Sequence, residues 1–396
     1  MTRMPPAIDA QAAARPWIRS AHDATLSVEM EGGLNLSAID SAALDALIDS
    51  RPDVGVFLSP AWLSGYFSEP PAGLEPSLVL LRHGTMLVGV APVGIRRTLM
   101  HTTIGLLGGG LYSDRVDLLA ARGYEAACAD AFLAWAAREF DRGFTLRLRD
   151  VPAESPLWGA IHRAGAEHRL SLAFSGSEIH THPYLELAMP SARAAAAPRP
   201  ALVPESLDKH RRWLARKGDV RIQLLHDADA VANAFETLVM LLHARWGDRE
   251  HGSTLDRQCA RRFHRYVLPR LLREGRLRMI RLSVDERTVG VFYGLACGRW
   301  WGYYLAGYDR AWAGRIRLGL ITLTAAIELA ALQGSETFDF LKGADRMKYE
   351  WPVRERATID GDVCSAHAGP QLERAARAAR DVAAACVKTA GHLVRR

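Results

Sequence analysis

The sequence predicts an α/β protein of two tandem lobes, each with a mixed, largely antiparallel sheet flanked by helices. The chain has 396 residues, which is long for one hydrophobic core and typical of two domains. Its halves show the same order of strands and helices. They also share a short sequence motif, because Val88–Val90 with Gly94 matches Val289–Val291 with Gly294. A repeat of this length indicates two copies of one fold.

Local signals place the elements of the first half. Ser59 and Pro60 are residue types preferred at a helix N-cap and first position, and they predict a helix that extends to Phe67. A hairpin signal at 83–85 separates two strand-like runs, 78–82 and 86–95. The other expected elements are strands at 25–30, 103–107 and 144–149 and helices at 37–50 and 124–140.

The second half repeats this order. Apolar residues at helical spacing predict helices that begin near Ala230 and near Cys259. A hairpin around 285–287 is expected between two strands. The expected strands are 277–284, 288–297, 300–306 and 337–341, with a helix at 317–333 before the last of them.

Composition shifts suggest the domain boundaries. We expect a mobile leader at 1–24, a first, degenerate lobe at 25–180 and a second lobe at 206–365. Residues 181–205, rich in Ala, Pro and Arg, are interpreted as a linker or insertion, although strand-like residues 184–187 could pair with the second sheet. An Ala/Arg-rich helix is expected at 366–396.

Composition also excludes several classes of protein. With 49% hydrophobic and 24% charged residues, the chain is close to globular averages, which disfavours both disorder and a membrane protein. The N-terminus lacks the pattern of a secretory signal, so a cytoplasmic location is expected. Five widely spaced cysteines without a Cys-x-x-Cys pair argue against a disulfide framework or zinc cage. The net charge of +6 is compatible with nucleotides, acidic glycans, nucleic acid or an anionic membrane.

Asp339 is the first candidate for chemistry. It lies in the predicted strand 337–341, where Phe338 and Phe340 would point to one face and the carboxylate to the other. A charged group in an apolar strand is either paired or functional, and a structural ion pair is an equally good interpretation. The first copy has Leu146 or Arg147 at the equivalent place, which favours a site in the second lobe.

Lys348, Tyr349 and Trp351 follow this strand. A solvated turn with Trp351 as a core anchor is the simple interpretation. The functional interpretation is that Lys348 provides positive charge, Tyr349 acts as a general acid and Trp351 forms a flat binding wall.

The loop before helix 317–333 is a candidate anion site. It contains Arg310, Arg315 and Arg317, and Gly319 lies in the first turn of the expected helix. Helix N-termini present free N–H groups to anions, so a pyrophosphate cradle is plausible, and an exposed basic turn is about as plausible.

The histidines give weaker signals. His243 lies near the end of a predicted helix and is a candidate general base, ranked below Asp339 because such a histidine is more often a cap. His180 and His182 share one face of a strand without an evident third ligand, so no metal is expected.

Several of these motifs resemble the CelD/BcsL branch of the GNAT acyltransferase superfamily, which is related to the Fem-type peptidoglycan aminoacyltransferases. The matching pieces are His243-x-Arg245-Trp246, the 275–282 strand, Tyr304-x-x-Gly307-Tyr308-Asp309, and Phe338–Leu341 with Gly343, Lys348 and Trp351. A weaker match in the first half comprises Phe57–Pro60 with Trp62, and Tyr112–Asp114 with Asp117.

The resemblance implies two GNAT-like lobes, with acyl-CoA bound as co-substrate in the second, where the central strands splay. The implied cofactor residues are Tyr304, Ala306, Gly307, Arg315, Arg317, Leu318, Gly319 and Leu320. The implied acceptor residues are Arg245, Trp246, Tyr303, Asp309, Lys348 and Trp351. One departure is that 316–319 reads Ile-Arg-Leu-Gly where the family usually has Ser-Pro-Gly.

We therefore expect an acyl-CoA-dependent N- or O-acyltransferase that acts on a sugar, a cell-envelope or exopolysaccharide precursor, or a small metabolite. Asp339 would serve as base or orient the acceptor, and Tyr349 would protonate the leaving thiolate. Two alternatives stay open: Fem-like transfer from aminoacyl-tRNA, supported only by the basic charge, and a non-catalytic scaffold of polysaccharide assembly. No integral membrane span is expected, and the acceptor and oligomeric state are left open.

Overall fold

The computed structural model describes residues 25–32, 41–98, 102–140, 143–166, 178–187, 207–247, 252–312 and 315–365. The strands of the first half are β1 (Ser27–Gly32), β2 (Glu75–His83), β3 (Met86–Arg97), β4 (Thr102–Leu106), β5 (Leu119–Ala120), β6 (Phe144–Pro152) and β7 (Ile179–Glu186). Its helices are α1 (Ser41–Ser50), α2 (Pro52–Gly55), η3 (Val56–Leu58), α3 (Pro60–Ser68), α4 (Glu125–Glu139) and α5 (Pro156–Ala166).

The strands of the second half are β8 (Val220–Leu224), β9 (Leu277–Val284), β10 (Arg287–Cys297), β11 (Trp300–Tyr308), β12 (Thr337–Asp339) and β13 (Arg354–Cys364). Its helices are α6 (Leu207–Ala215), α7 (Ala228–Trp246), η5 (Thr254–Asp256), α8 (Gln258–Arg273), η6 (Arg310–Trp312), α9 (Leu318–Leu332) and η7 (Arg346–Glu350). The predicted α/β fold is confirmed, and each predicted helix and strand within the described ranges is present, although the strand predicted at 337–341 ends at Asp339. The elements α2, α5, α6, β5, β8 and β13 were not anticipated.

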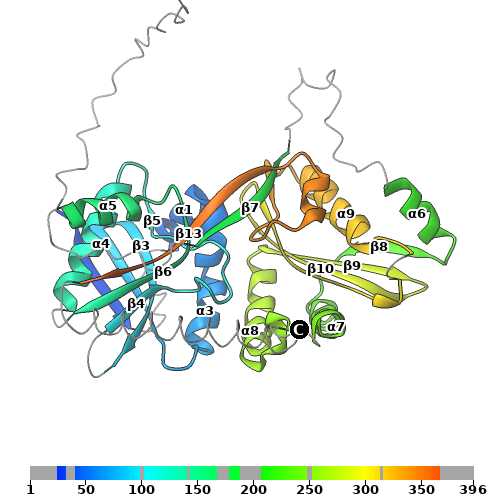
Figure 1. Ribbon diagram of the computed structural model, residues 1–396, viewed down its shortest axis with the longest axis horizontal. Helices are drawn as coiled ribbons and strands as arrows, with labels where there is room; N and C mark the ends of the chain where they lie inside the picture. Colours follow the sequence, from blue (N-terminus) through cyan, green and yellow to red (C-terminus); the bar gives the residue numbers. More distant parts are fainter. Residues whose placement is uncertain are drawn as a thin grey trace, which may run out of the picture.

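The described strands form one mixed sheet that runs through the whole molecule (Figure 1). Its order is β1-β2-β3-β4-β6-β13-β7-β12-β11-β10-β9-β8, and β5 pairs with β3. The repeat is visible in this order: hairpin β2–β3, then β4, α4 and a parallel β6 correspond to hairpin β9–β10, then β11, α9 and a parallel β12.

The two halves exchange their last strands. β7, from the first half, pairs with β12, whereas β13, from the second half, pairs with β6. β7 and β13 also pair with each other at the centre of the sheet, where they cross between the two ends of the molecule (Figure 1). We call β1–β6 with β13 the first lobe, and β8–β12 with β7 the second lobe.

The strand exchange places part of the expected linker inside the sheet. β7 runs through residues 181–186 of the expected linker, and its predicted pairing with the second sheet is confirmed by the register of Tyr184 with Asp339. The expected leader, the rest of the linker and the C-terminal helix lie outside the described residues.

Helices cover both faces of the sheet. On one face a single core spans both lobes, where α1 and α3 of the first meet α7 and α8 of the second. On the other face each lobe has its own core, with α4 and α5 in the first lobe and α9 in the second. α3 begins as predicted, because the Ser59 hydroxyl accepts a hydrogen bond from the backbone N–H of Trp62 and Pro60 follows it. Within the described ranges, no helix has the length and apolar character needed to cross a bilayer.

Candidate functional site

The central strands of the second lobe separate at one point. β11 and β12 are paired only from Trp300 with Thr337 to Gly302 with Asp339, and beyond these residues the strands diverge. At the same place β11 carries a β-bulge, because Gly294 and Tyr293 of β10 oppose Tyr303 and Leu305, which leaves Tyr304 as the extra residue. Bulges re-aim backbone and side chains and occur often beside active sites.

A cavity of about 600 Å³ lies beside this separation. It is lined by Arg245, Trp246, Tyr303, Tyr308, Asp309, Arg310, Trp312, Ile316, Arg317, Leu318, Gly319, Leu320, Asp345 and Met347. Its volume is within the range of small-molecule sites. The cavity thus brings together the predicted acceptor residues Arg245, Trp246, Tyr303 and Asp309 with the predicted cofactor residues 317–320.

The N-terminus of α9 forms one wall of this cavity. The helix runs from Leu318 to Leu332, and Arg317 at its N-cap makes no side-chain cap hydrogen bond. The first N–H groups of a helix have no partner within the helix, and they attract anions together with the helix dipole. Gly319 leaves space in the cavity at this wall, because a Cβ there would lie 3.2 Å from the ring of Tyr308.

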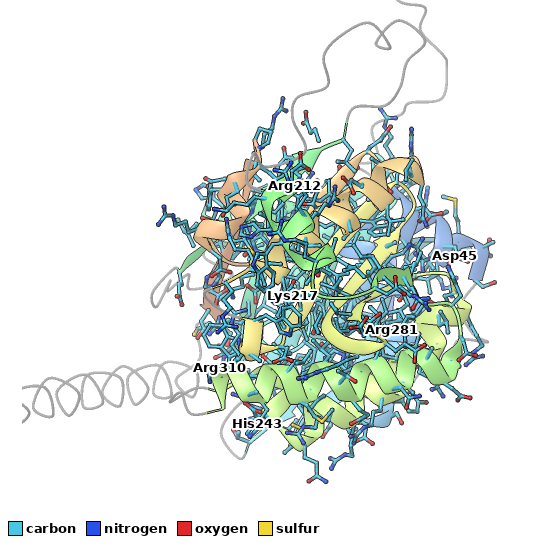
Figure 2. All side chains as sticks on the ribbon, turned by 90° about the vertical axis from the view of Figure 1, so that its right-hand side faces the viewer. Asp45, Arg212, Lys217, His243, Arg281 and Arg310 are labelled. Carbon is cyan, nitrogen blue, oxygen red and sulfur yellow. The ribbon has the colours of Figure 1, made fainter. Side chains whose placement is uncertain are left out.

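Three arginines, Arg245, Arg310 and Arg317, line the cavity. Figure 2 shows Arg310 on the end of the second lobe, together with Arg212 and Lys217. Arg310 donates to the carbonyl of Ala244 over 2.7 Å, and Arg245 lies over the ring of Trp246. Arg317 is paired with Glu350. The mouth is therefore suited to a phosphorylated ligand.

Asp339 lies at the vertex of the separation but is completely buried. Its side chain faces the shared core, opposite Phe338 and Phe340, as predicted. The carboxylate accepts hydrogen bonds from Leu341 N (2.8 Å) and Trp300 Nε1 (3.4 Å). Arg356 of β13 lies 3.9 Å away. Burial raises the pKa of Asp339, and the positive charges of Arg115 and Arg356 oppose this shift.

Lys348 holds the end of β12 in place. Its buried Nζ donates to the carbonyls of Leu341 (3.3 Å), Lys342 (2.8 Å) and Gly343 (2.9 Å). These residues form a tight turn, in which Leu341 has a φ of 55° and Gly343 a φ of 105°. Burial lowers the pKa of Lys348, although the nearby Asp345, Asp114 and Asp339 carboxylates act to raise it. The contacts of Lys348 thus correspond to a structural role.

The remaining predicted residues lie away from the cavity. Trp351 is buried against Phe340, and Tyr304 points to the other face of the sheet, where its hydroxyl donates to the carbonyl of Tyr112. Ala306 is buried, and Gly307 packs against Leu241 of α7. The exposed residues are Arg315, Tyr349, which donates to Glu355, and His243, which is bonded to Asp256.

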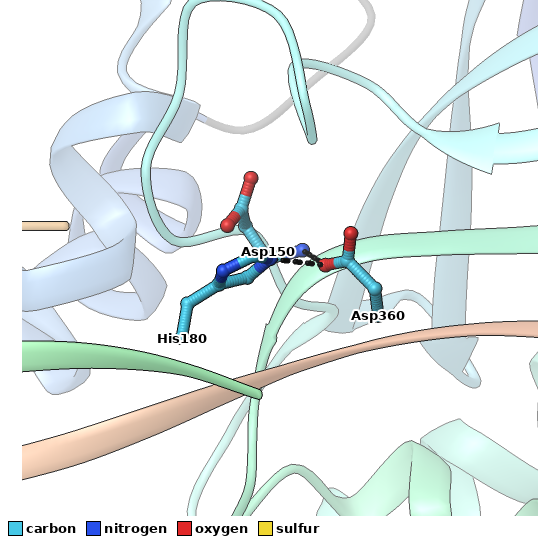
Figure 3. Close-up of side chains that lie close together, drawn as sticks. All are labelled: Asp150, His180 and Asp360. Carbon is cyan, nitrogen blue, oxygen red and sulfur yellow. Dashed lines mark hydrogen bonds and ion pairs between the residues drawn. The ribbon is translucent and has the colours of Figure 1, made fainter. Parts of the chain in front are cut away.

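A compact polar cluster lies where the lobes meet. The side chains of Asp150, His180 and Asp360 place one ligand atom each within 4.8 Å of one another (Figure 3). Lys342 Nζ, however, donates to Asp150 over 2.6 Å, and Asp360 accepts from the backbone N–H of Asp150 over 2.8 Å. Since a lysine already neutralises one carboxylate, we interpret the cluster as an ion-pair network that joins β6, β7 and β13.

Sequence reasoning missed part of the surroundings of Asp339. Arg115 of the first lobe is completely buried and contacts Asp53 (3.0 Å) and Glu154 (2.9 Å). Arg356 bridges Asp53 and Asp339 from β13. Arg115 is more than 200 positions from Asp339, and Arg356 lies on an unanticipated strand. Only the match of Tyr112–Asp114 indicated that the loop of Arg115 matters.

Comparisons with known proteins give one family match and similarities to solved structures. Residues 204–349 match the acetyltransferase (GNAT) domain family. The crystal structure of FemX superposes with a TM-score of 0.56 at 10% identity, covering 82% of this chain and 96% of FemX. A tandem GNAT protein from the clavulanic acid biosynthesis pathway has a TM-score of 0.44 at 16% identity, covering 86% of this chain and 98% of its own. No curated protein matches the sequence.

Proposed function

We propose that the protein transfers an acyl group from acyl-CoA to an amine or hydroxyl, with acyl-CoA bound in the cavity between α7 and the N-terminus of α9. The observation that carries this proposal is the position of that cavity. It lies where β11 and β12 separate, and it combines a helix N-terminus with arginines at its mouth.

The residues of the cavity fit the parts of acyl-CoA. The N–H groups of the first turn of α9, with Arg317 beside them, would bind the pyrophosphate. Tyr303 and Trp246 offer apolar surface to the pantetheine arm. Asp309 and Asp345 are the acidic residues of the lining, and Asp309 is paired with Arg287.

The bulge offers a second element of the reaction. Backbone N–H groups that leave a β-ladder can donate to the oxygen of a thioester carbonyl, where negative charge develops as a nucleophile attacks. Tyr304 is the bulged residue and lies two residues past Gly302, the last residue of β11 that pairs with β12. The bulge thus supports acyl transfer, and Asp339 and Lys348 would position the strand ends around it.

The resemblance to the CelD/BcsL branch supports a sugar or a cell-envelope or exopolysaccharide precursor as the acceptor.

Calorimetric titration of the protein with CoA and with acetyl-CoA tests the proposal. We expect binding in the micromolar range, weakened about 10-fold or more by Arg317→Ala or Gly319→Leu, because these variants remove a charge and fill the cradle. Arg221→Ala is the matched control, since Arg221 is an exposed arginine on β8 that is paired with Asp219. Absence of heat at high micromolar CoA would refute the proposal.

A further inference from the structure

The first lobe has its own point of strand separation. The parallel pairing of β4 with β6 extends only as far as Gly105 with Arg147. In the second lobe, the corresponding pairing of β11 with β12 extends as far as Gly302 with Asp339. Each lobe thus ends its parallel pair with a glycine opposite a charged residue, and the sign of the charge is reversed between the two lobes.

Arg147 and Asp339 point to the same face of the sheet. Leu146 and Leu148 pack in the core beneath α4, so Arg147, which lies between them, points to the opposite face. Asp339 likewise points away from α9, the counterpart of α4. The shared core covers this face in the second lobe, whereas the first lobe has a cavity beside Arg147.

This first-lobe cavity has a volume of about 130 Å³. Its charged lining consists of Arg96 from β3 and of Arg147 and Arg149 from β6. The volume is below the range of pockets that enclose a whole small molecule, so the cavity suits a single small group.

Glycines form the floor of the first-lobe cavity. β3, β4 and β6 lie side by side (Figure 1), and Gly94 of β3 is opposite Gly105 of β4, which is opposite Arg147. Gly109 lets the loop after β4 lie against β6, since a Cβ there would lie 2.4 Å from the carbonyl oxygen of Arg149. Glycine inside a strand weakens the sheet and often marks a place where a ligand approaches the backbone.

The charges around the first-lobe cavity are unequal. Arg149 lies 2.7 Å from Asp362 and 3.7 Å from Asp360, and Arg147 lies 3.8 Å from Asp362. Among the described residues, no acidic side chain lines the cavity itself. Two carboxylates therefore compensate three arginines, and an anion in the cavity would complete the balance.

We propose that the first-lobe cavity binds a phosphate group, either as the free ion or as the monoester of a small molecule. The planar forks of several guanidinium groups match the oxygens of a phosphate, and the glycine floor lets the anion approach the backbone. The inference does not depend on acyl transfer. It assigns a ligand to the first lobe, which lies outside the matched residues 204–349.

Calorimetric titration with inorganic phosphate and with glucose 6-phosphate, at constant ionic strength, tests the inference. We expect dissociation constants of about 1 mM or lower, raised about 10-fold or more by Arg147→Gln or by Arg96→Gln, because each variant loses charge-assisted hydrogen bonds to the anion. Arg96 is exposed and donates to the backbone carbonyl of Ala72, so Arg96→Gln should fold with the wild-type Tm even if Arg147→Gln does not.

Arg97→Gln is the matched control. Arg97 is the next residue of β3, and its side chain points to the other face of the sheet, where it lies over the ring of Phe140 and is paired with Glu75. This variant removes the same charge from the same strand without changing the cavity. We expect its affinity for phosphate to equal that of the wild type.

The N-terminus of α9 is a second place where phosphate can bind, so the titrations are repeated with Arg317→Ala. We expect this variant to keep the phosphate site of the first lobe. Binding that disappears in Arg317→Ala and persists in Arg96→Gln overturns the inference. It is also overturned by equal weakening in Arg96→Gln and Arg97→Gln, or by the absence of heat at about 10 mM of either probe.

The two probes distinguish the two sources of the phosphate group. Tighter binding of glucose 6-phosphate identifies a phosphate monoester as the ligand, and tighter binding of inorganic phosphate identifies the free ion. A protein that binds phosphate in the first lobe but binds no CoA contradicts the proposed function and supports this inference.

Discussion

Among single residues, Lys348 shows most directly how the motif that follows β12 stabilises the fold. Its ammonium group is buried and donates to the carbonyls of three consecutive residues, 341–343, where the chain turns with two positive φ angles. The sequence alone suggested a ligand-binding cation or a solvated turn as alternatives. The contacts show instead a lysine that satisfies carbonyls which an apolar side chain would leave without a partner.

Lys348→Met should therefore act on stability first. We expect a loss of about 2–4 kcal/mol of unfolding free energy in urea titrations, because each unsatisfied buried carbonyl costs about 1–3 kcal/mol and relief of the buried charge offsets part of it. Lys209→Met on α6 is the control, since Lys209 is exposed. A variant of wild-type stability without turnover would show that Lys348 acts on the reaction instead.

At the scale of elements, α3 and α8 join the two lobes by close packing. Gly65 of α3 makes this approach possible, since a Cβ there would lie 2.5 Å from both Phe263 and Val267 of α8. Trp62, one turn earlier, packs edge-on against Phe263 and Tyr304. The helix contact thus continues into the aromatic residues behind the bulge.

Gly65→Ala should force these helices apart. We expect a loss of about 1–3 kcal/mol of unfolding free energy, the usual effect of overpacking a core, although alanine is the better helix former. Gly159→Ala in α5 is the matched control, because its added Cβ would meet only the end of the Arg163 side chain at 3.4 Å. Equal stability changes in the two variants would contradict close packing of α3 on α8.

At the scale of the whole molecule, the strand exchange explains what the sequence could and could not predict. Caps, hairpins and helical periodicity are local, so elements such as α3 and β9–β10 were predicted almost to the residue. β13 has the sequence Arg-Glu-Arg-Ala-Thr-Ile-Asp-Gly-Asp-Val-Cys. Its charged residues conceal the alternation of apolar and polar residues that would predict a strand. They pair with partners far away in sequence, such as Asp362 with Arg149 over 2.7 Å.

The candidate site also has a part that the sequence could predict and a part that it could not. The start of α9, with Arg317 and Gly319, and the motif at the end of α7 were predicted, because each is a local signal that a helix terminus explains. The approach of Arg115 and Arg356 to Asp339, at the end of β12, depends on the packing of two lobes. No pattern within either segment encodes it.

The exchange also predicts how the protein unfolds. β7 supplies the partner of β12, and β13 supplies the partner of β6, so neither lobe has a complete sheet without the other half of the chain. Although chains of this length often unfold domain by domain, we expect a single cooperative transition in differential scanning calorimetry.

A chain that ends at Val353 lacks β13 and should lose this transition in both lobes, because β6 and β7 each lose a paired neighbour. A chain that ends at Ser365 keeps β13 and is the control. Two separate transitions in the full chain, or a truncation at Val353 that leaves one lobe melting at the wild-type temperature, would show that the lobes are stable without the exchange.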